Sequence, residues 1–208
     1  MAPRYPILVD LAGQPCLVVG GGVVAERKVL GLLGVGAIVT MIAPEATEVL
    51  AARAASGDGT LLWHTRRWSS ADLTSVAWRF VVAATDDAAL NRAVGAAAAD
   101  RGVWANDVSA PDGGAAALPA VHRQGPVTLS VSTGGVHPGA AAWLRDLAAG
   151  AIAPEHLTAL DLVAEVRAAS PQTSRPDWRQ AVDSGMLDLI REGRVAEAKE
   201  RLQACLSS

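Results

Sequence analysis

Cysteine is scarce in this chain of 208 residues, and its scarcity excludes two classes of protein. Only Cys16 and Cys205 occur, which is too few for a disulfide framework or for a zinc site built from cysteines. Close metal-ligand spacing is also lacking among the histidines, which are His64, His122, His137 and His156. The sequence therefore predicts no permanent metal site, and two unpaired thiols fit a reducing cytoplasm.

Charge of one sign and long apolar runs are lacking too. The chain has 18 Lys and Arg against 21 Asp and Glu, with the signs interspersed, so its formal net charge is only -3. The sequence has no basic stripe of the kind that binds nucleic acid. No apolar run approaches the roughly 18 residues that a membrane span requires. Half of the residues are hydrophobic, as expected for a globular protein. We expect no nucleic-acid partner, no membrane and a cytoplasmic location.

Aromatic residues other than tryptophan are almost missing, with one Tyr and one Phe beside six Trp. The tryptophans are scattered along the chain, so packing in a core or an interface explains them better than a platform for stacking bases. For Trp104, which lies close to the predicted cofactor edge, burial is the expected role.

Strands alternate with helices along the first half of the chain. Apolar runs typical of buried strands lie at 15–19, 37–42, 61–64, 78–84 and 103–108, and helical patterns lie at 23–33, 45–55 and 87–101. Such alternation indicates a parallel sheet with right-handed crossovers. The sequence therefore predicts an α/β fold with a Rossmann-like domain over residues 1–113.

The remainder of the chain has a different texture. After a stretch rich in Ser, Pro, Gly and Ala, residues 127–132 alternate as a strand, and helical patterns follow from Pro138, over 155–167 and over 178–206. We expect a small α+β region at 114–150 and a helical C-terminal domain at 151–208.

A glycine-rich turn joins the first strand to the first helix. Gly20-Gly21-Gly22-Val23-Val24-Ala25 satisfies the pattern G-x-G-x-x-A, in which the glycines allow a tight turn and close approach of a pyrophosphate. The N–H groups at the start of the helix favour a phosphate there. The sequence predicts dinucleotide binding by Gly20, Gly21, Gly22, Val23 and Val24, and the alternative is a purely structural turn.

Two further strand ends complete the predicted cofactor site. The second strand ends at Ala43 and Pro44, where an acid would usually bind the ribose 2′-hydroxyl, so the choice between NAD and NADP stays open. The fourth strand ends at Thr85 and Asp86, with Asn91 following in the next helix. These five residues are predicted to bind the cofactor, although Asp86 or Asp87 equally suits a helix N-cap.

Several motifs together resemble the precorrin-2 dehydrogenase family, whose fold also forms the dehydrogenase and ferrochelatase part of siroheme synthase. The resemblance covers about residues 5–147, and its motifs are Tyr5-Pro6, Asp10-Leu11, the run from Leu17 to Lys28, Ala83 to Asp87 with Leu90-Asn91, Asn106, Pro119-Ala120, Gly125-Pro126 and Ser130 to Gly135. It implies oxidation of precorrin-2 to sirohydrochlorin, with NAD as cofactor, by a homodimer whose dimerisation region lies at 114–150. Some relatives also insert a metal, so a bifunctional enzyme taking Fe²⁺ or Co²⁺ is one alternative.

One departure from the family bears on catalysis. The family typically has Asn-x-Val-Asp-x-Pro where this chain reads Asn106-Asp107-Val108-Ser109-Ala110-Pro111, so Ser109 replaces the aspartate regarded as central. Removing hydride and a proton from a tetrapyrrole needs a proton acceptor. Asp107 is the first substitute, expected to share a strand face with Ser109, and Asp112 is the second. The competing interpretation is that Asp107 caps a turn and that the chain is a silent NAD or tetrapyrrole binder.

The implied substrate carries many carboxylates, which call for cations and hydrogen-bond donors. The residues predicted to bind it are Arg27, Lys28, Asn106, His122, Ser132, Thr133, Gly134, Gly135 and His137. The competing interpretations are a solvated helix face for the two cations, and a strand-ending turn with a helix cap for Ser132 to Gly135. An unrelated NADP reductase is the last alternative.

Overall fold

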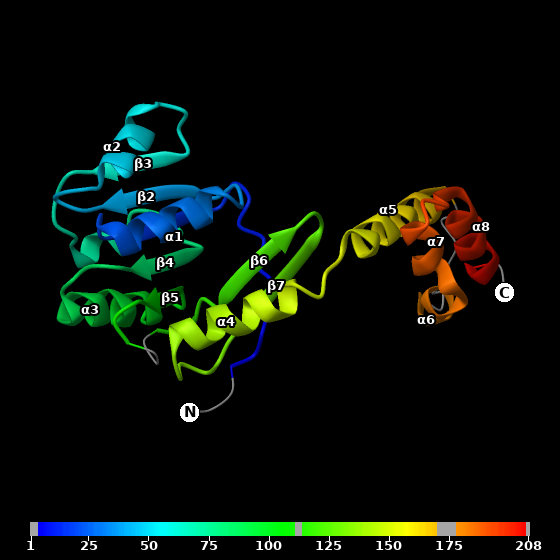
Figure 1. Ribbon diagram of the computed structural model, residues 1–208. Coiled ribbons are helices and arrows are strands. Elements are labelled where there is room, and N and C mark those ends of the chain that lie inside the picture. Colours follow the sequence, from blue (N-terminus) through cyan, green and yellow to red (C-terminus); the bar gives the residue numbers. More distant parts are fainter. Residues whose placement is uncertain (1–3, 111–113, 170–177, 207–208) are drawn as a thin grey trace. The chain divides into compact units, whose positions relative to one another are not determined.

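The computed structural model describes residues 4–110, 114–169 and 178–206. The chain forms two compact units, Met1–Leu118 and Pro119–Ser208, which Figure 1 colours from blue to green and from green to red. Each unit has its own sheet and its own buried side chains.

The first unit is built on a parallel sheet of five strands in the order β3-β2-β1-β4-β5. The strands are β1 (Pro15–Val19), β2 (Ile38–Ile42), β3 (Leu61–His64), β4 (Phe80–Ala83) and β5 (Trp104–Asp107). The intervening helices are α1 (Val23–Leu33), α2 (Glu48–Ala55), the short 3-10 helix η1 (Ser70–Leu73) and α3 (Ala88–Ala99). The expected Rossmann-like fold is confirmed, and β2, β4 and β5 are slightly shorter than the apolar runs that predict them.

Helices cover both faces of this sheet because its strands are apolar on both faces. Val18 and Met41 point to the face where α1 and α2 contribute Val29 and Leu50. Leu17 points to the opposite face, where α3 packs (Figure 1). The apolar face of α1 fixes its N-terminus over the end of β1.

The carboxyl ends of four strands lie side by side. In the register of the sheet, Val19 pairs with Ile42 on one side and with Ala83 on the other, and Ala83 pairs with Asp107. The chain reverses its direction of travel across the sheet between β1 and β4, and open α/β sheets bind ligands at such a point.

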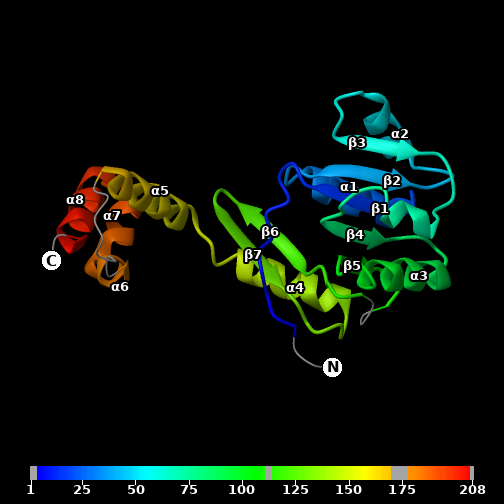
Figure 2. The same cartoon turned by 180° about the vertical axis from the view of Figure 1, so that it is seen from behind.

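The second unit begins with an antiparallel hairpin of β6 (Ala120–Gln124) and β7 (Val127–Val131), against which α4 (Pro138–Ala149) packs (Figure 2). The sequence pattern predicts β7 but not β6. The polar run His122-Arg123-Gln124 interrupts the apolar pattern that signals a strand, and pairing with β7 compensates for the interruption.

The last part of the chain is helical, with α5 (Pro154–Ala169), α6 (Trp178–Ala181), the π-helical turn η2 (Val182–Met186), α7 (Leu187–Arg191) and α8 (Val195–Leu206). The expectation of helical structure is confirmed, but the pattern over 178–206 is not one helix. Gly185 and Gly193 have φ of +84° and +77°, a backbone conformation that ends or kinks a helix.

Within the described ranges, no single helix is long and apolar enough to cross a membrane. The helices α4 and α5 pass that test of length and composition only as a pair, across a bend of 71°.

The expectation that Trp104 is buried is wrong. Trp104 opens β5 and is 44% exposed. Because β5 is the last strand of its sheet, the ring has a neighbouring strand on one side only. Trp143 of α4 is also exposed, at 65%.

We predict that the two thiols differ sharply in reactivity. Burial raises the pKa of Cys16 to about 11, and its side chain is fully enclosed, so at pH 8 it remains a shielded thiol. Cys205 is partly exposed. Titration of the native protein with a disulfide reagent at pH 8 should therefore modify Cys205 first and Cys16 only on unfolding. Rapid labelling of both residues in the native protein would contradict this assignment.

Candidate functional site

The glycine turn lies between two other backbone segments that leave no room for side chains. Gly20 has φ of +118°, and a Cβ there would lie 2.3 Å from the carbonyl oxygen of Ala84, just after β4. A Cβ on Gly21 would lie 2.1 Å from the carbonyl oxygen of Glu45, in the loop between β2 and α2. The backbone N–H of Gly20 also donates to Ile42 at 3.0 Å. The turn is therefore wedged between the ends of β4 and β2.

The third glycine is open. Nothing lies within 4 Å of a Cβ placed on Gly22, which is the N-cap of α1 and provides no side-chain cap. Val23 and Val24, at the start of the helix, are 68% and 38% exposed. The first N–H groups of a helix have no acceptor within it and carry a partial positive charge. This arrangement fits the pyrophosphate of a dinucleotide.

The end of β4 is held by an amide. The Asn91 side-chain oxygen accepts bonds from the Thr85 backbone N–H at 3.0 Å and from its hydroxyl at 2.7 Å, and the Asn91 amide donates to the Thr85 carbonyl at 3.0 Å. Asp87 is the N-cap of α3 and accepts from the N–H groups of Ala89 and Leu90. Asp86 is exposed beside it. Asn91 therefore fixes the shape of this strand end, while Asp87 performs the capping that either aspartate suited.

The expectation that Asp107 and Ser109 share a strand face is wrong. The strand β5 ends at Asp107, so Ser109 lies in the turn that follows. Both the N–H and the hydroxyl of Ser109 donate to Asp107 Oδ1, at 2.8 and 2.5 Å. Asp107 is 3% exposed, whereas Ser109 is exposed. The turn thus directs one oxygen of a buried carboxylate toward Ser109. Asp112 lies outside the described residues.

Asn106 ties the end of β5 to the segment that follows it. Its side-chain amide donates to the Ala116 carbonyl at 3.1 Å, and the Ala116 N–H donates to Ala105 at 3.0 Å. Gly114, with φ of +79°, approaches so closely that a Cβ would lie 2.1 Å from the Ala105 carbonyl oxygen. Asn106 is 8% exposed, so its amide has a structural role, which is to hold the segment around Ala116 against β5.

The loop after β2 contacts Glu26, a residue that was not among those predicted to bind the cofactor. Ala43 is buried, and its carbonyl accepts from the Trp63 indole at 2.9 Å, whereas Pro44 is exposed. Farther along the loop, the Thr47 hydroxyl donates to Glu26 Oε2 of α1 at 2.5 Å. Glu26 was missed because it is 21 residues away from Thr47 along the chain. The available signals were an acid in the first turn of α1 and a threonine before α2.

The two cations of α1 lie in different surroundings. Arg27 is exposed, while Lys28 is half-buried. Burial lowers the pKa of Lys28, and the charge of Arg27 lowers it further. Lys28 is therefore the more strongly desolvated of the two.

The other predicted substrate residues belong to the second unit. His122 lies on β6, and its Nε2 is shielded from solvent with no hydrogen-bond partner in the described part of the chain. Ser132 Oγ accepts from the Gly134 N–H at 3.4 Å, and His137 Nδ1 accepts from the Gly139 N–H at 3.0 Å as the N-cap of α4. The Thr133 hydroxyl donates to the His137 carbonyl at 3.4 Å, and Gly134 and Gly135 both have positive φ. Ser132, Thr133 and His137 thus use part of their hydrogen-bonding capacity within a turn and a helix cap.

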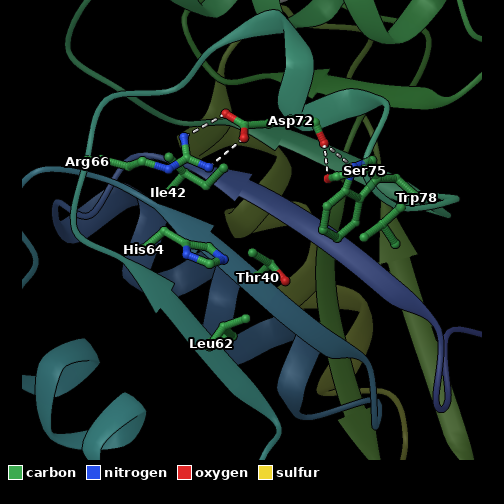
Figure 3. Close-up of a pocket in the computed structure, with 9 residues that line it drawn as sticks. Thr40, Ile42, Leu62, His64, Arg66, Asp72, Ser75 and Trp78 are labelled. Carbon is green, nitrogen blue, oxygen red and sulfur yellow. Dashed lines mark hydrogen bonds and ion pairs between the residues drawn. The ribbon is translucent and has the colours of Figure 1, made fainter.

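A separate small pocket lies over β2 and β3, on the sheet face opposite α1 (Figure 3). Its volume is about 110 Å³, below the roughly 300–1,000 Å³ typical of ligand sites. Figure 3 shows the Arg66 guanidinium turned toward the Asp72 carboxylate, above the His64 ring. The two nitrogens of Arg66 bond Asp72 at 2.5 and 2.9 Å, and this pairing holds the pKa of Asp72 below its usual range. Among the described residues, no three His, Cys, Asp or Glu side chains gather as a metal site.

We predict different effects of alanine at two glycines of the turn. Gly20→Ala should lower the free energy of unfolding by more than about 2 kcal/mol, because the new Cβ meets a carbonyl at 2.3 Å. Gly22→Ala should leave the melting temperature almost unchanged, since its site is open. The same methyl group occupies space needed by a pyrophosphate, so we expect NAD affinity to fall about tenfold or more. Thermal unfolding and calorimetric titration measure the two effects, and unchanged affinity in Gly22→Ala would contradict the site.

Comparison with known proteins gives a consistent result. The chain is 37% identical over 203 residues to the siroheme synthase of Methylococcus capsulatus, and 35% identical over 203 residues to siroheme synthase 1 of Aeromonas salmonicida. These matches cover 95% and 94% of this chain, but only 42% of each relative. The chain thus spans about two fifths of the length of these relatives.

A solved structure of SirC, precorrin-2 dehydrogenase, has the same fold. The TM-score is 0.70 at 24% sequence identity, and the match covers 99% of this chain and 100% of that one. This match confirms the fold, and the sequence matches to the siroheme synthases confirm the resemblance drawn from the motifs. A family model described as "Putative NAD(P)-binding" matches residues 7–120, which contain the glycine turn and the ends of all five parallel strands. The chain belongs to this NAD(P)-binding family.

Proposed function

We propose that the chain oxidises precorrin-2 to sirohydrochlorin with NAD as the cofactor. The observation that carries the proposal is similarity to siroheme synthases along 95% of the chain, combined with a glycine turn that fits a pyrophosphate. When bound, NAD supplies the hydride acceptor of the reaction. We place the reaction in the cytoplasm, in keeping with two free cysteines.

The first unit supplies the groups that hold the cofactor. Gly22 and the first turn of α1 leave open space and unbonded N–H groups for the pyrophosphate. Thr85 and Asn91 shape the end of β4, where we place the nicotinamide end of the cofactor. Because Val19, Ala83 and Asp107 are adjacent in the sheet register, this placement brings the cofactor close to the carboxylate that ends β5.

Asp107 is the proposed proton acceptor. Oxidation of the tetrapyrrole releases a proton as well as a hydride, and a carboxylate can take that proton whereas the hydroxyl of Ser109 cannot. Ser109 donates two hydrogen bonds to Oδ1, which leaves Oδ2 without a partner among the described residues. Ser109 is therefore a positioning residue in this proposal, and Oδ2 receives the proton.

The same contacts favour a second candidate function. A carboxylate that accepts hydrogen bonds from both the N–H and the hydroxyl of the residue two positions later caps its turn. A silent NAD or tetrapyrrole binder would retain such a cap for its stability. Ser109→Asp distinguishes the two. It should create or increase turnover in a silent binder, because it restores the acid typical of the family.

Exchanging Asp107 tests the proposed mechanism. Asp107→Asn should lower turnover by about 100-fold or more, since it removes the proton acceptor and preserves the shape of the side chain. The assay is anaerobic, with precorrin-2 generated in place and NAD added, following NADH and sirohydrochlorin together. Asp100→Asn, at the exposed C-cap of α3, is the matched control and should retain turnover. Full activity in Asp107→Asn would show that another group takes the proton.

The second unit offers a surface for the proposed homodimer. Along α4, Trp143, Leu144 and Leu147 are 65%, 36% and 65% exposed, and their spacing places them on one face of the helix. Val136, just before α4, is 82% exposed. We propose that this apolar face, within the dimerisation region at 114–150, is covered by a second copy of the chain.

A charge on that face should separate the subunits. We predict that Leu147→Glu shifts the molar mass measured by light scattering from dimer to monomer, because the interface would bury an unpaired carboxylate. Val49→Glu places the same charge on α2, where Val49 is 50% exposed, and should leave the dimer intact. A monomeric wild-type protein at micromolar concentration would contradict the proposed surface.

A further inference from the structure

The acid expected at the end of β2 is missing from the sequence there, but the fold supplies one from another element. A Cβ on Gly21 would lie 3.1 Å from the Cβ of Ala43, and the Thr47 N–H donates to the Gly21 carbonyl at 3.0 Å. The loop from Ala43 to Thr47 is therefore held against the glycine turn. Glu26, in the first turn of α1, reaches the far end of this loop, where its carboxylate accepts from the Thr47 hydroxyl at 2.5 Å.

That carboxylate lies beside the N-terminus of α2, where it accepts a hydrogen bond from the hydroxyl of the N-cap residue. Thr47 is the N-cap of this helix of 8 residues, and its hydroxyl accepts from the Leu50 N–H at 3.3 Å while donating to Glu26. A helix N-terminus attracts anions. Without Glu26, the start of α2 would be suited to the 2′-phosphate that distinguishes NADP from NAD, because the adenosine ribose of a Rossmann-like site lies at the end of β2.

One basic side chain beyond the end of β3, that of Arg66, is already paired with a carboxylate. Arg66 follows β3, whose last residue, His64, pairs with Ile42 of β2. Both terminal nitrogens of Arg66 are bonded to Asp72. A phosphate that bound Arg66 would have to displace this bidentate ion pair.

We propose that Glu26 is the residue that selects NAD over NADP. Its carboxylate lies beside the start of α2, where it repels a 2′-phosphate, and its second oxygen accepts a hydrogen bond from a ribose hydroxyl. The inference rests on the proposed nucleotide site. It assigns to Glu26 the role that the sequence pattern usually gives to an acid at position 43. Glu45 is another carboxylate of the same loop, and its side chain is exposed.

The experiment is calorimetric titration of the purified chain with NAD and with NADP. The wild-type protein should bind NAD at least about tenfold more tightly than NADP, since specificity of this kind rests on repulsion of the wrong ligand. Glu26→Gln, which removes the charge and retains the shape, should reduce that ratio by about tenfold or more, mainly by strengthening NADP binding. Glu45→Gln is the matched control and should leave the ratio unchanged.

The outcomes separate this inference from the proposed function. Wild-type protein that binds neither nucleotide overturns both. Wild-type protein that binds NAD and NADP equally overturns the role of Glu26 alone, and this result needs no variant to fold. An unchanged ratio in folded Glu26→Gln, or a collapsed ratio in Glu45→Gln, likewise overturns the role of Glu26 and leaves the nucleotide site standing.

Discussion

The nucleotide site depends on two backbone approaches that exclude a Cβ. At Gly20 the turn after β1 meets the backbone that follows β4, and at Gly21 it meets the loop that follows β2. Three strand ends are thereby fixed with respect to one another by main-chain contacts, which are stiffer than contacts between flexible side chains. The open position at Gly22, the amide clamp on Thr85 and the carboxylate of Glu26 all take their places from this arrangement.

The sequence predicted those parts of the site that are local. Three glycines between an apolar run and an amphipathic pattern indicate a strand, a turn and a helix without knowledge of any neighbour. The hydrogen bond between Glu26 and Thr47 was not predictable in this way, because it joins two helices through a tertiary contact. The pairing of β6 escaped for a similar reason, since a polar strand such as the one containing His122 is recognisable only beside its partner.

The loop after β5 shows how the position of a strand end alters the interpretation of the residues beside it. A strand continuing to Ser109 would have placed Asp107 and Ser109 on one face, as two equivalent side chains. Because the strand ends at Asp107, the chain turns, and the two residues form a hydrogen-bonded pair instead. Positions 107 and 109 of this chain therefore differ in backbone setting, and an acid at one is not equivalent to an acid at the other.

The segment around Ala116 has a consequence for association between molecules. Its hydrogen bonds to Ala105 and from Asn106 cover part of the outer side of β5, and an edge strand that is covered cannot recruit a strand from another molecule. The opposite margin of the sheet is β3, where Leu62 is 54% exposed. Intermolecular strand addition, the first step of many aggregation reactions, is thus directed to the β3 margin, away from the strand that carries Asp107.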